Sequence, residues 1–364
     1  MTKQLKNEFV GNYVNDIVDL LIASAVSGTH AILIGAPGWG KTAIARQAAE
    51  RMSGGAYSFT RVDPSTPPEV LRGAFNPAAI LEGRLERVVD GTPYDPACKI
   101  GIIDEIFRGS DVLFDAALDV LDRQDVLNAP PMWSTANFVA TGTRVEALVD
   151  RIGLWGWIKP GLVDVGAISL SHLVNGGKPF LGHTLPELSQ IEEIRAASAT
   201  ERAARVVIEA LENLGEEAQK EGLRAHPRRV AAWAKIMFSY SMYLSGSNDF
   251  SSLPKGAIGI MKYAWPATTA QEAATWASIA AASIDPVATA IEAALMSAYV
   301  EFKRVSEIKD AVDRGTESAK LGEVMLQAKQ TLKAFNTDDP RIAEAMDQIE
   351  EWFANAVRGR EVSM

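Results

Sequence analysis

The stretch that decides the fold runs from Ala31 to Thr42 and reads AILIGAPGWGKT. Apolar residues typical of a buried strand lead into a glycine-rich loop that fits the pattern G-x-x-x-x-G-K-[ST]. Glycines in such a loop let backbone amides approach phosphate oxygens, and the helix expected after it adds the positive end of its dipole. The loop is therefore predicted to bind the phosphates of a nucleotide.

The same spacing assigns individual roles. Lys41 is expected to reach the β- and γ-phosphates, and the Thr42 hydroxyl is expected to ligate Mg2+. The residues of this segment predicted to contact the nucleotide are Gly35, Pro37, Gly38, Trp39, Gly40, Lys41, Thr42 and Ala43. The motif leaves the position of Trp39 open, and we interpret a tryptophan there as packing against another surface rather than merely covering the loop.

A second motif supplies acids. Ile100–Glu105 reads IGIIDE, an apolar strand that ends in two carboxylates. Adjacent buried strands would place Asp104 beside Thr42, where Asp104 would bind Mg2+ directly or through water. Glu105 would then polarise the attacking water as general base.

Composition limits the class of protein. The chain has 364 residues, of which 47% are hydrophobic and 23% charged, and this length suits two or three globular domains. The formal net charge of -10 argues against a nucleic acid backbone as the main partner, because that role needs basic surface. The single cysteine, Cys98, excludes an intramolecular disulfide. With neither a signal peptide nor a membrane span expected, the protein is predicted to be cytoplasmic.

The first half of the chain alternates between strand and helix patterns. Strands are predicted at 30–34, 57–60, 100–103 and 137–140, and helices at 8–28 and about 41–52. This alternation indicates a parallel sheet whose ligand chemistry lies at the carboxyl ends of the strands. From about residue 186 onward the pattern is almost entirely helical. The predicted fold class is therefore α/β, with a parallel sheet flanked by helices and followed by helical regions.

Two apolar stripes at helical spacing lie near the end of the chain. The first consists of Leu321, Met325, Ala328, Leu332 and Phe335, and the second of Ile342, Met346, Ile349, Phe353 and Val357. Asp339 suits the N-cap of the second helix and Pro340 its first position. The pattern predicts an antiparallel helical hairpin.

The pair Asp104-Glu105 resembles the acid pair of the AAA+ (additional-strand) ATPases. The segment Asp63–Gly73 (DPSTPPEVLRG) is similar to the S-T-P-E-E-V-x-G segment of the MoxR family, and in particular of its RavA branch. Other segments that resemble this family are DEIFRG at 104–109, EGRLERVV at 82–89, ALVDRI at 147–152 and AHPRR at 225–229. The resemblance covers about residues 9–265, is sparse over 153–200, and is absent after about residue 266.

The resemblance implies a domain plan. Residues 1–185 would form the AAA+ α/β nucleotide-binding core, with a helix-2 insert hairpin at about 74–97. Residues 186–265 would form an all-α lid, and 266–364 a helical C-terminal extension ending in the antiparallel hairpin.

The resemblance also implies site residues beyond the two motifs. Val10 and Gly11 fall where such proteins place a Val-Gly pair against adenine. Thr143 falls at the sensor-1 position, where the family usually has Asn, and Thr141 is its alternative. Arg151 falls at the arginine-finger position, acting on the nucleotide of a neighbouring subunit. Arg228 falls at sensor 2, with Arg229 as the alternative.

These roles imply an ATP- and Mg2+-dependent hydrolase that assembles as a homo-oligomeric ring, by resemblance a hexamer. Its expected work is chaperone-like remodelling or maturation of a protein complex, beside a partner with a von Willebrand A domain. One alternative is a nucleic-acid-dependent motor or a restriction-type translocase subunit, which the acidic net charge disfavours. The other is a nucleotide-gated scaffold with little turnover, against which the intact Lys41, Asp104 and Glu105 weigh.

Overall fold

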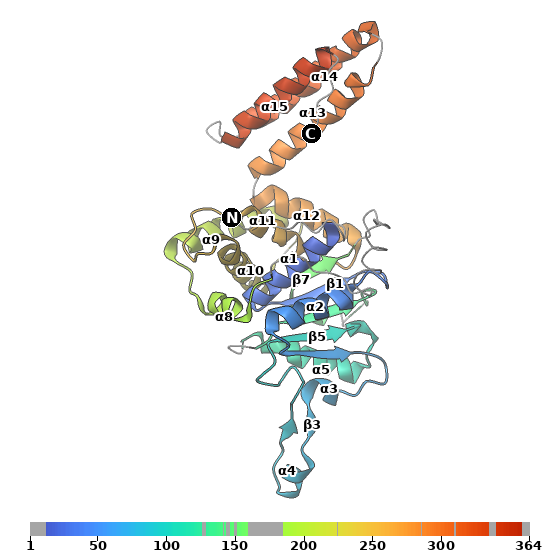
Figure 1. Cartoon of the computed structure of the whole chain (residues 1–364), viewed down its shortest axis with the longest axis vertical. Helices are drawn as coiled ribbons and strands as arrows, with labels where there is room; N and C mark the ends of the chain where they lie inside the picture. Colours follow the sequence, from blue (N-terminus) through green and yellow to red (C-terminus); the bar gives the residue numbers. More distant parts are fainter. Residues whose placement is uncertain are drawn as a thin grey trace. The chain divides into compact units, whose positions relative to one another are not determined.

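A parallel five-stranded sheet lies at the centre of the α/β part of the chain, with the strand order β2-β5-β6-β1-β7. The strands are β1 His30–Ile34, β2 Tyr57–Arg61, β5 Ile100–Asp104, β6 Met132–Ala136 and β7 Ile152–Trp157. Because the strands are parallel, their carboxyl ends share one edge of the sheet (Figure 1). The predicted parallel α/β core is confirmed.

The computed structural model describes residues 12–125, 129–140, 142, 146–148, 151–158, 185–223, 225–284, 286–308, 311–334 and 340–358. Six residues discussed above lie outside these ranges: Val10, Gly11, Thr141, Thr143, Phe335 and Asp339.

The strand predicted at 137–140 is wrong, because the strand of this region is β6, Met132–Ala136. All five residues of β6 are buried, and Trp133 pairs with Ala31 on one side and Ile102 on the other. The polar Ser134 and Thr135 interrupt the apolar run, so the sequence pattern pointed to the next segment. As a result, Asn137 directly follows the strand at the carboxyl edge of the sheet.

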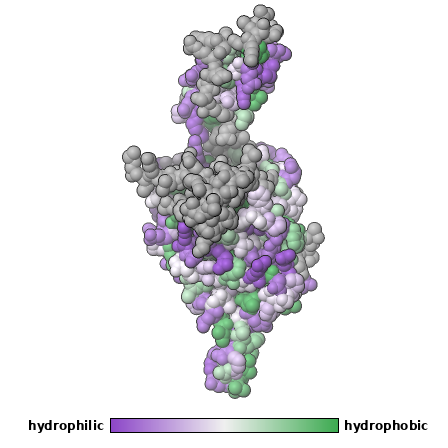
Figure 2. Space-filling model, turned by 45° about the vertical axis from the view of Figure 1, so that its right-hand side comes forward, coloured by the Kyte–Doolittle hydropathy of each residue, from purple (hydrophilic) through white to green (hydrophobic). Residues whose placement is uncertain are grey.

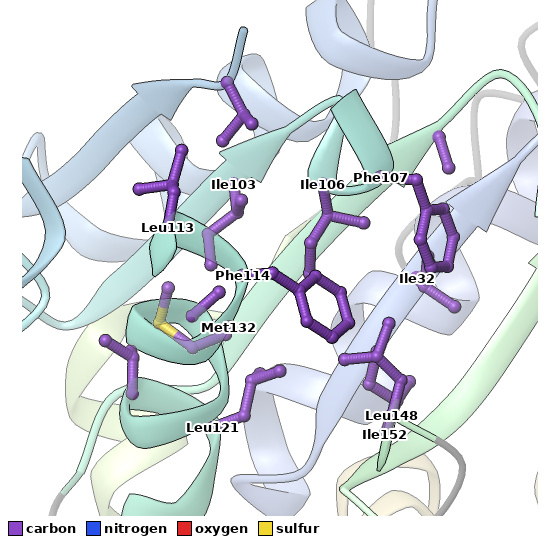
Figure 3. Packing of buried hydrophobic residues seen from close by; sticks show 14 of the residues in the cluster. Ile32, Ile103, Ile106, Phe107, Leu113, Phe114, Leu121, Met132, Leu148 and Ile152 are labelled. Carbon is purple, nitrogen blue, oxygen red and sulfur yellow. The ribbon is translucent and has the colours of Figure 1, made fainter. Parts of the chain in front are cut away.

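Helices cover both faces of this sheet (Figure 1). On one face α5, Asp111–Leu121, packs on the side chains of Ile32 and Ile34 from β1 in a continuous apolar cluster (Figure 3). On the other face lie α1, Asn12–Ser27, and α2, Lys41–Ser53. Gly156 of β7 leaves room there for Leu20 of α1, since a Cβ at Gly156 would lie 2.7 Å from the Leu20 side chain. The packing of helices on both faces holds the carboxyl ends of β1 and β5 in place, where the glycine-rich loop and the Asp104-Glu105 pair lie.

His30 joins three elements inside the core. Its Nδ1 accepts a hydrogen bond from the Met132 backbone N–H at 2.9 Å, and its Nε2 therefore donates to the Leu121 carbonyl at 2.9 Å. One accepting and one donating nitrogen define a neutral ring. Burial lowers the pKa of His30 to about 4, so the ring keeps this pattern at neutral pH.

A slender hairpin projects from the α/β part (Figure 1). It follows the short helix α3 Glu69–Arg72, whose Leu71 packs in the core of the sheet. Its elements are β3 Ala74–Phe75, α4 Pro77–Leu81 and β4 Arg87–Val88, and β3 pairs with β4 in antiparallel fashion. Gly73 at its base has φ 82°, and a Cβ there would lie 2.4 Å from the Val88 carbonyl oxygen. Near the end of the hairpin Leu81 and Leu85 are 90% and 83% exposed, and Figure 2 shows both apolar and polar surface on this projecting part.

A helical region follows the sheet in the sequence. Its described elements are α8 Leu188–Ala196, α9 Glu201–Lys220, α10 Pro227–Ser245, α11 Lys255–Ile260, the 3-10 turn η3 Met261–Tyr263 and α12 Ala270–Ile284. Three tryptophans hold it together: Trp276 packs on Trp233 and Trp265 with ring centroids 5.5 and 5.0 Å apart. The Trp233 indole also donates to the Ala264 carbonyl at 2.8 Å.

The chain divides into two compact units, Met1–Ala280 and Ala281–Met364. Residues 266–280 therefore pack with the helical region rather than with the last helices, and the boundaries predicted at 185 and 265 stay predictions. The second unit consists of α13 Pro286–Ser306, α14 Ala311–Lys333 and α15 Pro340–Arg358. The consecutive helices α14 and α15 contact each other and share one core with α13, and the predicted antiparallel hairpin stays a prediction.

The buried face of α15 differs in part from the predicted stripe. Ile342 and Ile349 are buried as expected, whereas Phe353 is 38% exposed and Trp352 is buried in its place. Trp352 packs on Phe302 of α13 with centroids 6.3 Å apart, a contact that the two-helix pattern did not include. Among the described residues, every helix is too short or too polar to span a bilayer.

Candidate nucleotide-binding site

The loop 35–40 connects β1 to α2 at the carboxyl edge of the sheet. Gly38 and Gly40 have φ values of 89° and 75°, a left-handed backbone that glycine adopts without strain. Gly40 is the N-cap of α2, so Lys41 and Thr42 form the first turn of the helix. Trp39 is half-buried in the loop. Ala36, Pro37, Gly38, Gly40 and Ala43 are exposed.

Lys41 lies folded into this loop. Its Nζ donates to the carbonyls of Gly35 and Ala36 at 2.8 and 2.9 Å and to Asn137 Oδ1 at 2.8 Å. Burial lowers the pKa of Lys41, while the charges of Glu105 and Asp104 oppose that shift. The ammonium is thus positioned within the loop where the motif places it.

Asp104 and Thr42 meet as the two motifs predict. Thr42 Oγ1 donates to Asp104 Oδ1 at 2.5 Å, and Thr135 Oγ1 donates to the same oxygen at 2.6 Å. Asp104 is only 4% exposed. A buried carboxylate beside a hydroxyl is the oxygen donor set that Mg2+ prefers, so these side chains fit the ion that the motif implies.

Glu105 adopts a special conformation one residue further on. Its φ of 61° makes it the single described non-glycine residue with a positive φ, and strain of this kind concentrates at functional sites. The Glu105 N–H donates to Thr135 Oγ1 at 3.1 Å, so Thr135 orients both acids. The Glu105 carboxylate accepts a hydrogen bond from the Asn137 side-chain amide.

Asn137 therefore bridges the lysine of the first motif and the glutamate of the second. Its amide oxygen accepts from Lys41, and its amide nitrogen donates to Glu105. This asparagine lies immediately after the central strand β6. Thr143, the residue predicted for the sensor-1 role, lies outside the described residues and stays a prediction.

Arg151 lies at the opposite edge of the sheet. It directly precedes β7, whose first residue Ile152 pairs with His30 at the start of β1. A five-residue strand spans roughly 15 Å, so Arg151 is far from the loop of its own chain. Its guanidinium donates to both oxygens of Asp122, from Nε and from an Nη at 2.8 Å each, and to the Ala147 carbonyl at 2.6 Å.

The two candidates for sensor 2 have different environments. Arg229 is 5% exposed, lies over the Trp265 ring at 5.6 Å and donates to the Ala264 carbonyl at 3.5 Å. Arg228, in the first turn of α10, is exposed. Arg229 therefore takes part in the tryptophan cluster, while Arg228 has its side chain in solvent.

Sequence reasoning missed three side chains of this site: Thr135, Asn137 and Arg61. Arg61 ends β2 with its Nε 3.9 Å from Asp104 Oδ2, and its side chain is 71% exposed. Thr135 and Asn137 could have been predicted from the order of the strands. Because β6 lies between β1 and β5, the carboxyl end of β6 must lie between the glycine-rich loop and the Asp104-Glu105 pair.

A central parallel sheet with this strand order, a glycine-rich loop after β1 and an Asp-Glu pair at the end of the next strand but one are the arrangement of the AAA+ α/β fold. Comparison with known proteins agrees. The solved structure of a "putative ATPase" from Cytophaga hutchinsonii ATCC 33406 matches with a TM-score of 0.50 at 15% identity, covering 70% of this chain and 84% of that chain. At that identity the likeness shows the fold alone.

Residues 1–152 match the family model of the MoxR domain in the MoxR-vWA-beta-propeller ternary systems. This match, over residues 1–152, supports the predicted resemblance to the MoxR family of AAA+ ATPases. The place of the chain in the RavA branch stays a prediction.

Proposed function

We propose that this protein hydrolyses ATP in a Mg2+-dependent reaction at the site around Lys41. The observation that carries the proposal is the continuous contact from Lys41 through Asn137 to Glu105, beside the Thr42–Asp104 pair. These groups stand on neighbouring strand ends, where a phosphate chain in the loop would lie.

Each residue then has a chemical task. Lys41 and the loop amides bind and neutralise the phosphates. Thr42 and Asp104 would hold Mg2+, which neutralises charge on the phosphate oxygens when bound. Glu105 orients a water molecule and accepts its proton, and Asn137 fixes the Glu105 carboxylate relative to Lys41.

The proposed site is completed by a second subunit. Arg151 cannot reach the nucleotide of its own chain from the amino edge of the sheet, but it lies near the surface with its side chain 22% exposed. A cation supplied from a neighbour stabilises the transition state and makes turnover depend on assembly. This supports a ring, for which the family resemblance suggests six subunits.

The helical region would act as the lid. Arg228 is the better sensor-2 candidate, because Arg229 is buried in the tryptophan cluster. A cation on the lid that binds the γ-phosphate would couple hydrolysis to movement of the lid against the α/β core.

The proposed work is remodelling of a protein complex with a von Willebrand A domain partner, as the description of the matching family suggests. The projecting hairpin favours a protein partner over nucleic acid. Its Arg84 is paired with Glu82 and Glu86, while Leu81 and Leu85 are exposed. An apolar tip with neutralised charge suits polypeptide contact rather than phosphate contact.

The test is the ATPase rate of the full chain at physiological salt, measured alone, with a von Willebrand A domain protein from the same host, and with single- or double-stranded DNA. The proposal expects stimulation by the protein and none by DNA. Strong stimulation by DNA alone would favour a nucleic-acid motor. A protein that binds ATP without measurable turnover under all conditions would be a nucleotide-gated scaffold.

A further inference from the structure

Asp122, at the end of α5, fixes the direction of the Arg151 side chain. Nε and one Nη of Arg151 donate to the two carboxylate oxygens of Asp122 at 2.8 Å each, and the other Nη donates to the Ala147 carbonyl at 2.6 Å. Two N–H donors on one carboxylate form the bidentate geometry that adds orientation as well as attraction. The guanidinium is therefore oriented by groups of its own chain.

Both partners of this contact are attached to the buried core. Asp122 directly follows Leu121, and Arg151 directly precedes Ile152. Leu121 and Ile152 are buried in one apolar cluster, together with Leu148 (Figure 3). Because the core fixes the backbone on both sides, the ion pair holds the guanidinium in one place and does not merely join two mobile side chains.

The turn that carries Asp122 is also held at the residues before and after it. The Leu121 carbonyl accepts the hydrogen bond of 2.9 Å from the buried His30 ring. The Arg123 guanidinium lies over the Tyr94 ring, with its Cζ 4.4 Å from the centroid. Support from a surrounding shell of contacts is what a precisely placed functional group requires.

The stability of α5 does not account for an acid at this position. Asp122 is the C-cap of the helix, where the negative end of the helix dipole disfavours a carboxylate. The Asp122 side chain is 45% exposed, and ion pairs at exposed positions typically contribute little to the free energy of unfolding. Holding Arg151 for a task outside its own chain explains the aspartate better.

We propose that Asp122 is a positioning residue for the reaction in the neighbouring subunit, because it presents Arg151 to the nucleotide of that subunit in a fixed orientation. This rests on the proposed function, which takes Arg151 as the cation supplied across the interface. A long side chain that is already held loses less conformational entropy when it binds. A guanidinium presents five N–H donors in one plane, so it can contact a carboxylate and a phosphate together.

The experiment measures turnover and ATP affinity of assembled, full-length Asp122→Asn protein. Turnover is expected to fall about tenfold to hundredfold, because the Asn amide nitrogen is a donor and cannot replace the second carboxylate oxygen. ATP affinity should not change, since Asp122 lies at the edge of the sheet opposite the loop.

Asp119→Asn is the matched control. Asp119 lies about one turn earlier in α5, has a similar exposure of 53% and pairs with Arg72 instead of Arg151. Its replacement also removes an aspartate–arginine pair from the end of this helix. Turnover should stay at the wild-type level in this variant, and a loss equal to that of Asp122→Asn would overturn the proposal.

Mixed assemblies distinguish a misplaced arginine from a damaged nucleotide site. Asp122→Asn mixed with Glu105→Gln should regain turnover, because the intact site of the first variant then meets a well-placed arginine from the second. Asp122→Asn mixed with Arg151→Ala should stay slow, because every subunit then supplies a defective arginine. A general loss of stability would not produce this pattern, and the opposite pattern would overturn the proposal.

Asp122→Glu tests position separately from charge, because it keeps the carboxylate but lengthens the side chain by one methylene group. Its turnover is expected to be about tenfold below wild type, and this variant decides the matter if Asp122→Asn does not assemble. Wild-type turnover in either variant would overturn the positioning role. Failure of the proposed function looks different, because Arg151→Ala itself would then keep wild-type turnover.

Discussion

Asn137 Oδ1 accepts a hydrogen bond of 2.8 Å from Lys41 Nζ, although 96 positions separate the two residues in the chain. The contact exists because β6 lies between β1 and β5. It places an amide between Lys41 and Glu105, and we propose that Asn137, rather than Thr143, assists the hydrolysis step.

Replacing Asn137 by Ala should therefore lower the ATPase rate by about 10²–10³-fold with little change in ATP affinity. The reason is that Glu105 and Lys41 would lose the group that fixes their relative positions. Steady-state hydrolysis and nucleotide binding measure the two effects separately. Thr143→Ala serves as the comparison, and the assignment fails if that variant loses turnover while Asn137→Ala retains it.

The two arginines at the start of α10 should respond differently to removal. Arg228→Ala is expected to reduce turnover without changing stability, because Arg228 is exposed. Arg229→Ala should lower the free energy of unfolding by about 1–2 kcal/mol through loss of its contacts with Trp265 and Ala264. Urea unfolding and ATPase assays on both variants check this. Equal effects on stability would contradict the distinction.

If Arg151 acts on the nucleotide of a neighbouring subunit, oligomers that contain two different inactive variants should be active. Arg151→Ala alone should reduce turnover by about 10³-fold or more, and Glu105→Gln should be inactive by itself. A mixture of the two should regain activity, because an intact site in one subunit meets an intact arginine from its neighbour. A mixture that stays inactive, although both chains co-assemble, would show that Arg151 does not act across subunits.

His30 predicts a pH dependence of stability. Its pKa is about 4 in the folded chain and about 6.5 when exposed, so between these values the unfolded chain binds a proton that the folded chain does not. Its contribution is therefore complete above pH 6.5 and is lost as the pH falls toward 4. Between pH 7.5 and 5 the loss should be roughly 2 kcal/mol.

Urea unfolding of wild-type and His30→Asn protein at pH 7.5 and pH 5 isolates the contribution of His30 to the free energy of unfolding. The variant should be less stable at pH 7.5, but its stability should fall less on acidification. Parallel pH profiles of the two proteins would show that His30 is not held neutral.

Residues that lie close together in the sequence were predictable from it. The loop 35–42, the acids at 104 and 105 and the parallel sheet all follow from local pattern and from the alternation of strands and helices. The metal pair Thr42–Asp104 was also expected, because both residues stand at ends of strands with unmistakable apolar runs.

Asn137 and Thr135 were not predictable in the same way. The strand before Asn137 contains Ser134 and Thr135, whose hydroxyls are buried in the sheet, so its hydropathy does not identify it as a central strand. Likewise, Trp352 replaces Phe353 in the core of α15 because a third helix, α13, packs against it. Both deviations come from contacts with distant segments, which a local periodicity does not contain.

The central claim is that Glu105 is the general base of an ATP-hydrolysing site. Its most direct test is the single-turnover hydrolysis rate of Glu105→Gln protein saturated with Mg2+ and ATP, with Lys41→Ala as the variant that fails to bind. The account predicts retained binding and a rate at least about 10²-fold below wild type. Hydrolysis at the wild-type rate would contradict it.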